Sequence, residues 1–273
     1  LRAKPVFVDI DPVHYNVDPA QIEKAMTDCT KAVMPVHLFG QCAPMGPILD
    51  VCKTRNVPVM EDAAQALGAK YRGKMAGTLG DFGCFSFYPT KNRGGYGDGG
   101  IITTDSEETA DLLRRLRVHG ARPKYHHAIV GTNSRLDAIQ AAVLGVKLPH
   151  LDGWAAARRE HADYYRKQFE GSAVVTPTED PDCHHVYNQF VIRIPNREKV
   201  MAALKDSGIG CEIYYPVTMD QQECFAGTPA ASREGIEVAH RLAGEVLSLP
   251  IYPELTRQQL DLVKASIFEF TRS

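Results

Sequence analysis

The chain has 273 residues, of which 44% are apolar and 23% charged, and its formal net charge is −2. These values are ordinary for a globular protein with a large core. They argue against a protein that binds nucleic acid or an anionic membrane surface, because such proteins concentrate basic residues. No apolar run approaches the about 20 residues that cross a bilayer.

Short apolar runs alternate with helical patterns in the first part of the chain. The expected elements, in chain order, are strand 5–10, helix 19–26, strand 32–37, helix 45–54 and strand 57–60. This order predicts a parallel sheet with helices on both faces, and ligands bind beyond the carboxyl ends of such strands. Polar residues gather at those ends, namely Asp9, Asp11, His37, Glu61 and Asp62.

The pattern changes after Asp62. We expect strands at 80–87 and 101–104, a helix at 107–117, a polar stretch to 133, and helices at 136–148 and 154–169 joined at 149–153. The remainder predicts strands at 185–194 and 211–215 and helices at 197–206, 232–246 and 257–270. Three parts follow from this order: a large cofactor-binding domain over 1–150, a connecting helix over 151–170, and a small α+β domain over 171–273. Because the chain starts on Leu1 directly before a strand, we expect the large domain to be N-terminally incomplete.

Seven cysteines are scattered along the chain, and none forms a Cys-x-x-Cys pair. This predicts neither a disulfide framework nor a zinc site and favours the reducing cytoplasm. Cys183-His184-His185 resembles a set of metal ligands, but no second cluster completes it, so we expect no metal.

Lys91 is the most informative residue. It follows the strand expected at 80–87, and the acidic pair Glu61-Asp62 ends the buried strand upstream. A lysine, a carboxylate at a strand end and a small hydroxyl residue between them are what a pyridoxal phosphate site requires. Strand alternation places Glu61 and Asp62 on opposite faces, so only one of them can face a cofactor. The plain alternatives are a solvated loop lysine and an aspartate that caps the next helix.

Several ordered blocks carry a resemblance that covers almost the whole chain. They are 36–41 (VHLFGQ), 61–65 (EDAAQ), 80–87 (GDFGCFSF), 91–92 (KN), 97–100 (GDGG), 117–120 (RVHG), 133–142 (NSRLDAIQAA), 212–216 (EIYYP) and 248–253 (SLPIYP). Together they resemble the sugar aminotransferases of the DegT/DnrJ/EryC1/StrS family, which are pyridoxal phosphate enzymes of fold type I. The resemblance implies an α/β fold, with a mostly parallel central sheet in a large domain and a smaller α+β C-terminal domain.

The resemblance also implies roles for five residues. Lys91 would bind the cofactor aldehyde covalently, and Asp62 would pair with the pyridine nitrogen. Gln65 would lie near the ring hydroxyl, and Ser86 would bind the phosphate. Asn133 would reach the phosphate of a neighbouring subunit, which implies a homodimer with shared active sites. Two departures stand out: the family's N-terminal region is absent, and Val217-Thr218-Met219-Asp220 replaces its usual Pro-Leu-His.

The implied reaction is transamination of a nucleotide-linked keto-sugar with glutamate as amino donor, giving an amino-sugar nucleotide. Pyridoxal 5'-phosphate would be the cofactor and pyridoxamine 5'-phosphate its intermediate form. One alternative is a pyridoxamine phosphate-dependent sugar dehydratase, but Lys91 argues against it, because those relatives replace the lysine. Another is a catalytically silent member that serves as a dimerising or regulatory module.

Substrate contacts are predicted from polar and aromatic residues near the strand ends and in the polar stretch. Lys124 and Tyr125 lie in a basic-aromatic segment that either meets a nucleotide diphosphate or forms a solvated loop. The other candidates are His37, His185 and Tyr187. The two histidines also fit strand ends satisfied by the backbone, and Tyr187 also fits an ordinary core position.

Overall fold

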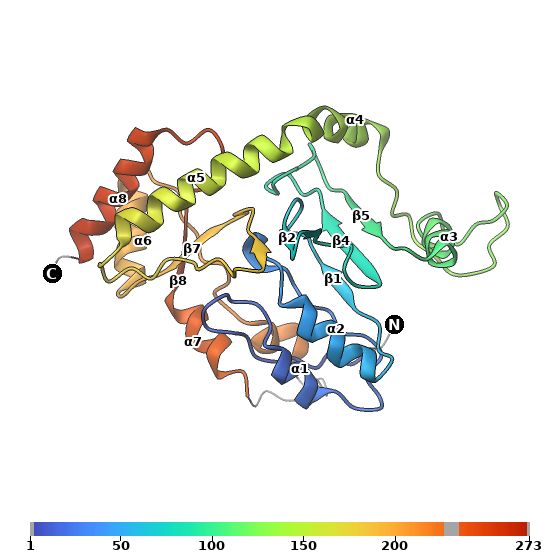
Figure 1. Cartoon of the computed structure of the whole chain (residues 1–273). Helices are drawn as coiled ribbons and strands as arrows, with labels where there is room; N and C mark the ends of the chain where they lie inside the picture. The colour runs from blue at the N-terminus through green and yellow to red at the C-terminus, as the bar shows by residue number, and fades with distance from the viewer. Residues whose placement is uncertain (1–2, 227–234, 272–273) are drawn as a thin grey trace.

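The structure, a computed structural model, describes residues 3–226 and 235–271. Figure 1 shows the long helix α5 (Leu151–Phe169) running along one side of the molecule and joining its two halves. One half holds a mixed sheet with α1 and α2 below it, and the other holds the strand pair β7–β8 with α6 and α8. Within the described residues, no helix is both long and apolar enough to cross a membrane.

The main sheet has the order β1-β4-β5, with β1 at Met60–Asp62, β4 at Phe82–Ser86 and β5 at Gly100–Thr103. β1 and β4 are parallel, and β5 runs antiparallel to β4. The segment around Val33 and Val36 extends the sheet beyond β1 through two parallel bridges. The prediction that these segments lie side by side in one sheet is therefore confirmed. The sheet is parallel except for β5, which forms an antiparallel edge.

Two strands predicted in the first part of the chain are not continuous strands. Segment 32–37 contacts β1 only through single bridges, and Pro35 lies between them. Proline has no N–H to donate to a ladder, which interrupts the pairing there. Segment 5–10 likewise takes part only in isolated bridges, Ile10 with Val17 among them. These two predictions placed extended chain correctly but overstated its pairing.

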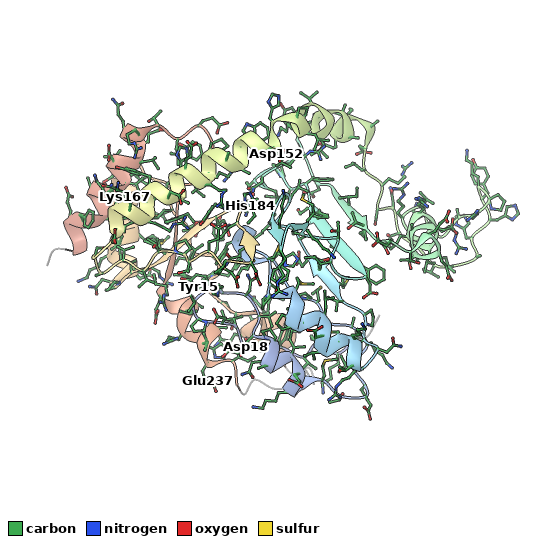
Figure 2. The ribbon with its side chains drawn as sticks, in the orientation of Figure 1. Tyr15, Asp18, Asp152, Lys167, His184 and Glu237 are labelled. Carbon is green, nitrogen blue, oxygen red and sulfur yellow. The ribbon has the colours of Figure 1, made fainter. Side chains whose placement is uncertain are left out.

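Helices α1 (Pro19–Ala25) and α2 (Met45–Thr54) lie where their patterns predicted them. The Asp18 side chain caps α1 by accepting a hydrogen bond from the Ala20 N–H at 2.9 Å, and Pro19 follows in the first helical turn (Figure 2). Ile22 of α1 and Ile48 of α2 pack into one buried cluster with Val59. This packing holds the start of β1 on the helical layer.

The sequence patterns did not predict a small hairpin of β2 (Lys70–Tyr71) and β3 (Lys74–Met75), which β6 (Cys183–His184) extends. Its two turn residues, Arg72 and Gly73, both have positive φ, 47° and 80°. Two-residue hairpin turns of the type I′ class require that geometry, and a glycine at the second position favours it. Gly73 was the available signal.

The junction predicted between two helices at 149–153 lies slightly earlier, at residues 148–150. Helix α3 (Glu107–Leu116) is separate, but α4 (Ala138–Lys147) continues through the 3-10 turn η2 (Leu148–His150) directly into α5. Pro149 stands at the start of that turn, where a missing N–H breaks no helical hydrogen bond. The segment between α3 and α4 projects away from the body (Figure 1).

The C-terminal part pairs β7 (Phe190–Arg193) with β8 (Val246–Leu249) in antiparallel register. Helix α6 (Arg197–Asp206) matches its prediction, and α8 (Arg257–Thr271) extends one residue beyond it. Two 3-10 turns, η3 (Met219–Gln221) and η4 (Glu223–Phe225), follow the loop over 210–215. The strand expected at 211–215 is reduced to one bridge, Glu212 with Ser248. Helix α7 (Glu237–Glu245) begins later than the predicted 232, and residues 232–234 lie outside the described part.

Two clusters of buried side chains lie mainly in one half each, and a third, which includes Tyr15, Phe39 and Leu242, joins the two halves. The largest runs from Ala162 to Ile267 and includes Phe190, Leu204 and Leu247. A second runs from Ile22 to Ala76 and adds Ala155 and Val186 from later in the chain. The three predicted parts and their boundaries stay a prediction.

Candidate active site

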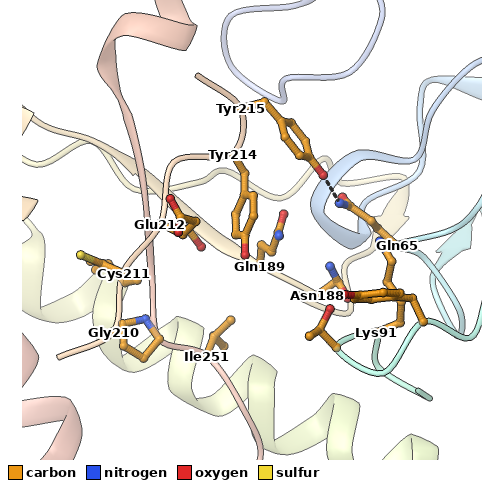
Figure 3. Close-up of a pocket in the computed structure, with 15 residues that line it drawn as sticks. Gln65, Lys91, Asn188, Gln189, Gly210, Cys211, Glu212, Tyr214, Tyr215 and Ile251 are labelled. Carbon is orange, nitrogen blue, oxygen red and sulfur yellow. Dashed lines mark hydrogen bonds between the residues drawn. The ribbon is translucent and has the colours of Figure 1, made fainter. Parts of the chain in front are cut away.

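One cavity of about 560 Å³ lies where segments distant in the chain converge (Figure 3). Gln65 follows β1, and Tyr88, Thr90 and Lys91 follow β4. The opposite walls come from residues 188–189, from the loop over 210–215 and from residues 248–251. Of the residues predicted for the site, the cavity lining includes Lys91 and Gln65.

Lys91 lies in a turn just beyond β4, and its N–H donates to the Tyr88 carbonyl at 2.9 Å. Burial of the side chain lowers the pKa of the Lys91 amine, and the negative charge of Asp62 acts in the opposite direction. A lowered pKa increases the share of neutral, nucleophilic amine at a given pH. The Lys91 amine is therefore suited to attack an aldehyde. The negative charge of Asp62 acts on the same amine and favours its ammonium form.

Asp62 ends β1 and is held there by the neighbouring segment 35–37. Its N–H donates to the Pro35 carbonyl at 2.9 Å, and its carbonyl accepts from the His37 N–H at 2.9 Å. One carboxylate oxygen accepts from the Ala64 N–H at 3.0 Å. The carboxylate retains capacity for a further donor, because two oxygens accept more than one hydrogen bond.

Gln65 joins the two halves of the cavity. Its Oε1 accepts from the Phe39 N–H at 2.7 Å, and its Nε2 donates to the Tyr215 hydroxyl at 2.9 Å (Figure 3). Burial raises the pKa of the Tyr215 phenol, so the phenol is protonated at neutral pH. It accepts the bond from Gln65 and keeps its own proton for another acceptor. The sequence patterns did not single out Tyr215; its position in the block 212–216 was the available signal.

Glu61 is fully buried on the face of β1 opposite Asp62, as strand alternation predicted. Its carboxylate accepts from His37 Nε2 at 2.8 Å and from the N–H groups of Gly77, Leu79 and Gly80, each at 2.7 Å. Burial by itself would raise the pKa of Glu61, but the hydrogen bonds from His37 and the backbone lower it below its ordinary value. Glu61 therefore anchors the approach to β4.

His37 is predicted to bind substrate, and the structure gives it a different task. The ring is fully buried, Nε2 donates to Glu61, and Nδ1 accepts from the Ala43 N–H at 3.0 Å. Both ring nitrogens are thus occupied within the protein. The alternative of a strand-end histidine satisfied by neighbours describes its position, and we withdraw the substrate contact.

His185 and Tyr187 are also predicted substrate residues, and both are buried. Their rings stack with centroids 3.8 Å apart, and the Tyr187 hydroxyl accepts a hydrogen bond from Arg166. Burial, together with the positive charges of Arg159 and Arg166, lowers the pKa of His185 to about 3. Both rings are covered by protein, so we withdraw these two predicted substrate contacts as well.

The other predicted residues lie outside the cavity lining. Ser86 ends β4, and its hydroxyl accepts from the Tyr88 N–H at 3.2 Å. Asn133 is exposed on the projecting segment between α3 and α4 and accepts from Arg135 Nε at 3.2 Å. Lys124 and Tyr125 are exposed on the same segment, with the ammonium 4.9 Å from the ring centroid. Their predicted contacts with cofactor and substrate stay predictions.

A family model matches residues 1–268, and its description is DegT/DnrJ/EryC1/StrS aminotransferase family. The chain belongs to this family. The match confirms the resemblance seen in the ordered sequence blocks, and the chain is accordingly an aminotransferase of fold type I.

Similar proteins cover nearly the whole chain. A "Pleiotropic regulatory protein" from Geobacillus stearothermophilus is 50% identical over 99% of this chain and 73% of its own length. A "UDP-N-acetyl-3-dehydro-alpha-D-glucosamine 3-aminotranferase" from Acidithiobacillus ferrooxidans is 43% identical over 95% of this chain and 70% of its own. The crystal structure of DesV from S. venezuelae in complex with a ketimine intermediate has a TM-score of 0.94 and 39% identity, covering 98% of this chain and 72% of that chain.

We expect Glu61→Gln to lower the free energy of unfolding at pH 7 by about 3–5 kcal/mol, because a glutamine brings an N–H group against backbone donors. Since the folded-state pKa of Glu61 is lowered, its contribution is complete above the unfolded pKa of about 4.3 and is lost as the pH falls through the folded value. Urea unfolding at pH 7 and at pH 3.5 should show the gap shrinking. Exposed Glu170→Gln is the control, and a gap independent of pH would contradict the assignment.

We expect the pKa of the Lys91 amine to lie below the ordinary lysine range, with the exposed Lys74 as the reference peptide. Asp62→Asn should lower the Lys91 pKa further, because the substitution removes a charge that favours the ammonium form. The measurement is competitive acetylation of the cofactor-free protein across a pH series, followed by mass spectrometry of the two lysine peptides. An unchanged or raised Lys91 pKa in Asp62→Asn would show that the two charges do not interact.

Proposed function

We propose that this protein transfers an amino group from glutamate to a nucleotide-linked keto-sugar and so produces an amino-sugar nucleotide. The observation that carries the proposal is the Lys91 amine, which faces a large cavity under the charge of Asp62, in a chain of the aminotransferase family. The Acidithiobacillus relative is named as an aminotransferase of a UDP-linked sugar, and this name supports the proposed substrate class.

The residues around the cavity fit pyridoxal 5'-phosphate. Lys91 supplies a half-buried amine of lowered pKa for its aldehyde, and Asp62 supplies a carboxylate with free acceptor capacity for its ring nitrogen. The Ser86 hydroxyl, at the end of β4, is our candidate for a phosphate contact. When bound, the cofactor supplies an electron sink for the negative charge left by loss of the α-proton.

Lys91 has two tasks in the proposed reaction. It first holds the cofactor and is then released as a free amine by the amino donor. Its lowered pKa increases the share of free amine, which carries the proton away from the donor carbon and later delivers it in the sugar half-reaction. The charge of Asp62 favours a positive charge beside it.

Gln65 and Tyr215 orient the groups in the cavity. The hydrogen bond between them ties the loop over 210–215 to the end of β1, so the two walls are held at a set distance. The unused Tyr215 proton points to a role as donor to an oxygen of cofactor or substrate.

The proposed assembly is a homodimer in which Asn133 of one subunit reaches the site of the other. Its exposed position on the projecting segment, outside this chain's own cavity lining, supports that arrangement. All seven cysteines fall within the described residues and are unpaired, which supports a reducing compartment such as the cytoplasm.

A second candidate is a catalytically silent regulatory module. The Geobacillus relative, which is 50% identical, is named as a regulatory protein, and this name favours the regulatory module. The two candidates differ in one respect that is simple to measure: only the enzyme needs Lys91 to bind the cofactor covalently.

Lys91→Ala should abolish the absorbance band near the visible edge that wild type forms with pyridoxal phosphate, and should reduce kcat at least about 10²–10⁴-fold, because both the covalent bond and the base are lost. Absorbance spectra before and after borohydride, and product formation from glutamate and keto-sugar, provide the measurements. Lys74→Ala, at an exposed position of β3, should behave as wild type. A wild-type protein without this band would favour the regulatory module.

Mixed dimers test the shared site. A dimer with Lys91→Ala on one chain and Asn133→Ala on the other should keep one undamaged site if Asn133 acts across the interface, and therefore about half of the wild-type kcat. The same two substitutions on one chain, paired with wild type, should damage both sites. Equal activity of the two arrangements would place Asn133 outside the partner's site.

A further inference from the structure

Two side-chain amides in the cavity wall carry buried oxygens without hydrogen-bond partners. Asn188 Oδ1 and Gln189 Oε1 are both covered, and neither accepts a hydrogen bond from any described residue. Both residues line the cavity that also holds Lys91 (Figure 3). A buried acceptor without a donor costs free energy, and native proteins retain few of them unless a ligand or water supplies the donor.

The backbone that carries these amides is held rigidly. The Gln189 N–H donates to the Phe39 carbonyl at 3.3 Å, and the Val186 N–H donates to the Gly40 carbonyl at 3.0 Å. Gly40 has a φ of 104°, and a Cβ on it would lie 2.9 Å from the backbone nitrogen of Asn188. The 3-10 turn η1 (Leu38–Gly40), which precedes α2, is therefore packed closely against this segment.

The same segment is tied to the lysine turn from the other side. Asn92, the residue after Lys91, donates from Nδ2 to the Val186 carbonyl at 3.3 Å. Asn188 and Gln189 thus stand at a fixed position relative to the reacting amine. A polar pair on such a support binds a ligand without first losing conformational entropy.

The side chains of the cavity fit an uncharged polyhydroxyl group, such as the sugar ring of a nucleotide-sugar. Its fifteen lining residues include one cation, Lys91, and one carboxylate, Glu212, and no arginine that could hold a carboxylate in a bidentate pair. Side-chain amides and sugar hydroxyls each donate and accept, so they satisfy one another. Tyr88, Tyr214 and Tyr215 add aromatic faces to the same lining.

We propose that Asn188 and Gln189 bind the hydroxyl groups of the sugar ring next to the carbon that receives the amino group, and so select the keto-sugar. This inference rests on the proposed function and deepens it. The two amides act only when sugar is present. The half-reaction with the amino donor therefore does not depend on them, whereas the half-reaction with the sugar does.

The first experiment measures the binding energy of the sugar ring directly. Isothermal titration of the holoenzyme compares UDP-glucose with UDP, and dTDP-glucose with dTDP; neither hexose carries a ketone, so none is consumed. In wild type, the nucleotide-sugar should bind about tenfold tighter than the free nucleotide in at least one pair, as expected for two hydrogen bonds. In Gln189→Met and in Asn188→Leu this ratio should fall to about threefold or less.

The second experiment separates the half-reactions. With glutamate alone, both variants should convert the cofactor absorbance at a rate within about twofold of wild type, while KM for the keto-sugar rises. Gln258→Met, at an exposed position of α8, is the matched control for the glutamine substitution. The use of two different substitutions keeps the test valid if one of them fails to fold.

A wild type that binds sugar nucleotide and free nucleotide equally would overturn the inference, and so would variants that keep the wild-type ratio. Equal slowing of both half-reactions in both variants would also overturn it, because the amides would then act on the cofactor or on the fold. Failure of wild type to react with glutamate at all is a different result: it would contradict the proposed function itself.

Discussion

The buried carboxylate of Glu61 is the interaction on which the geometry of the site depends. Four donors converge on it, from His37 and from the backbone of residues 77–80, within 2.7–2.8 Å. It thereby ties the segment before β1 and the turn before β4 to the same point. Since neighbouring residues of a strand face opposite sides, anchoring Glu61 in the interior turns Asp62 toward Lys91. Glu61 therefore stabilises the fold at this point, and Asp62 remains available for the proposed chemistry.

The cavity is built from segments that meet only in the folded chain. The bond between Gln65 and Tyr215 joins residues 150 positions apart. The segment 186–189 is held by the turn at Phe39-Gly40 on one side and, at Val186, by Asn92 on the other. Such clamps keep the lysine, the amide pair and the aromatic wall in one arrangement before any ligand arrives. This preorganisation is the physical basis for both the proposed reaction and the proposed choice of sugar.

Locally encoded elements were predicted well. Helices α1 and α2 have clear start signals or apolar stripes, and their bounds agree with the patterns within one residue. Predictions were poorer where pairing decides the outcome: segment 32–37 reads as a strand, but Pro35 limits it to single bridges. The hairpin at 70–75 was overlooked, because a two-residue turn leaves a weaker trace than a helix.

The sequence by itself determined the family, the identity of Lys91 as the candidate reactive amine, and the choice between two faces at Glu61-Asp62. Ordered motifs and strand alternation are local properties, so they can be read along the chain. Only the tertiary structure decided which polar residues form hydrogen bonds within the protein interior and which line the cavity. It buried His37 and Tyr187 among protein partners and left the oxygens of Asn188 and Gln189 without any, because hydrogen bonds between distant segments form only after the chain has folded.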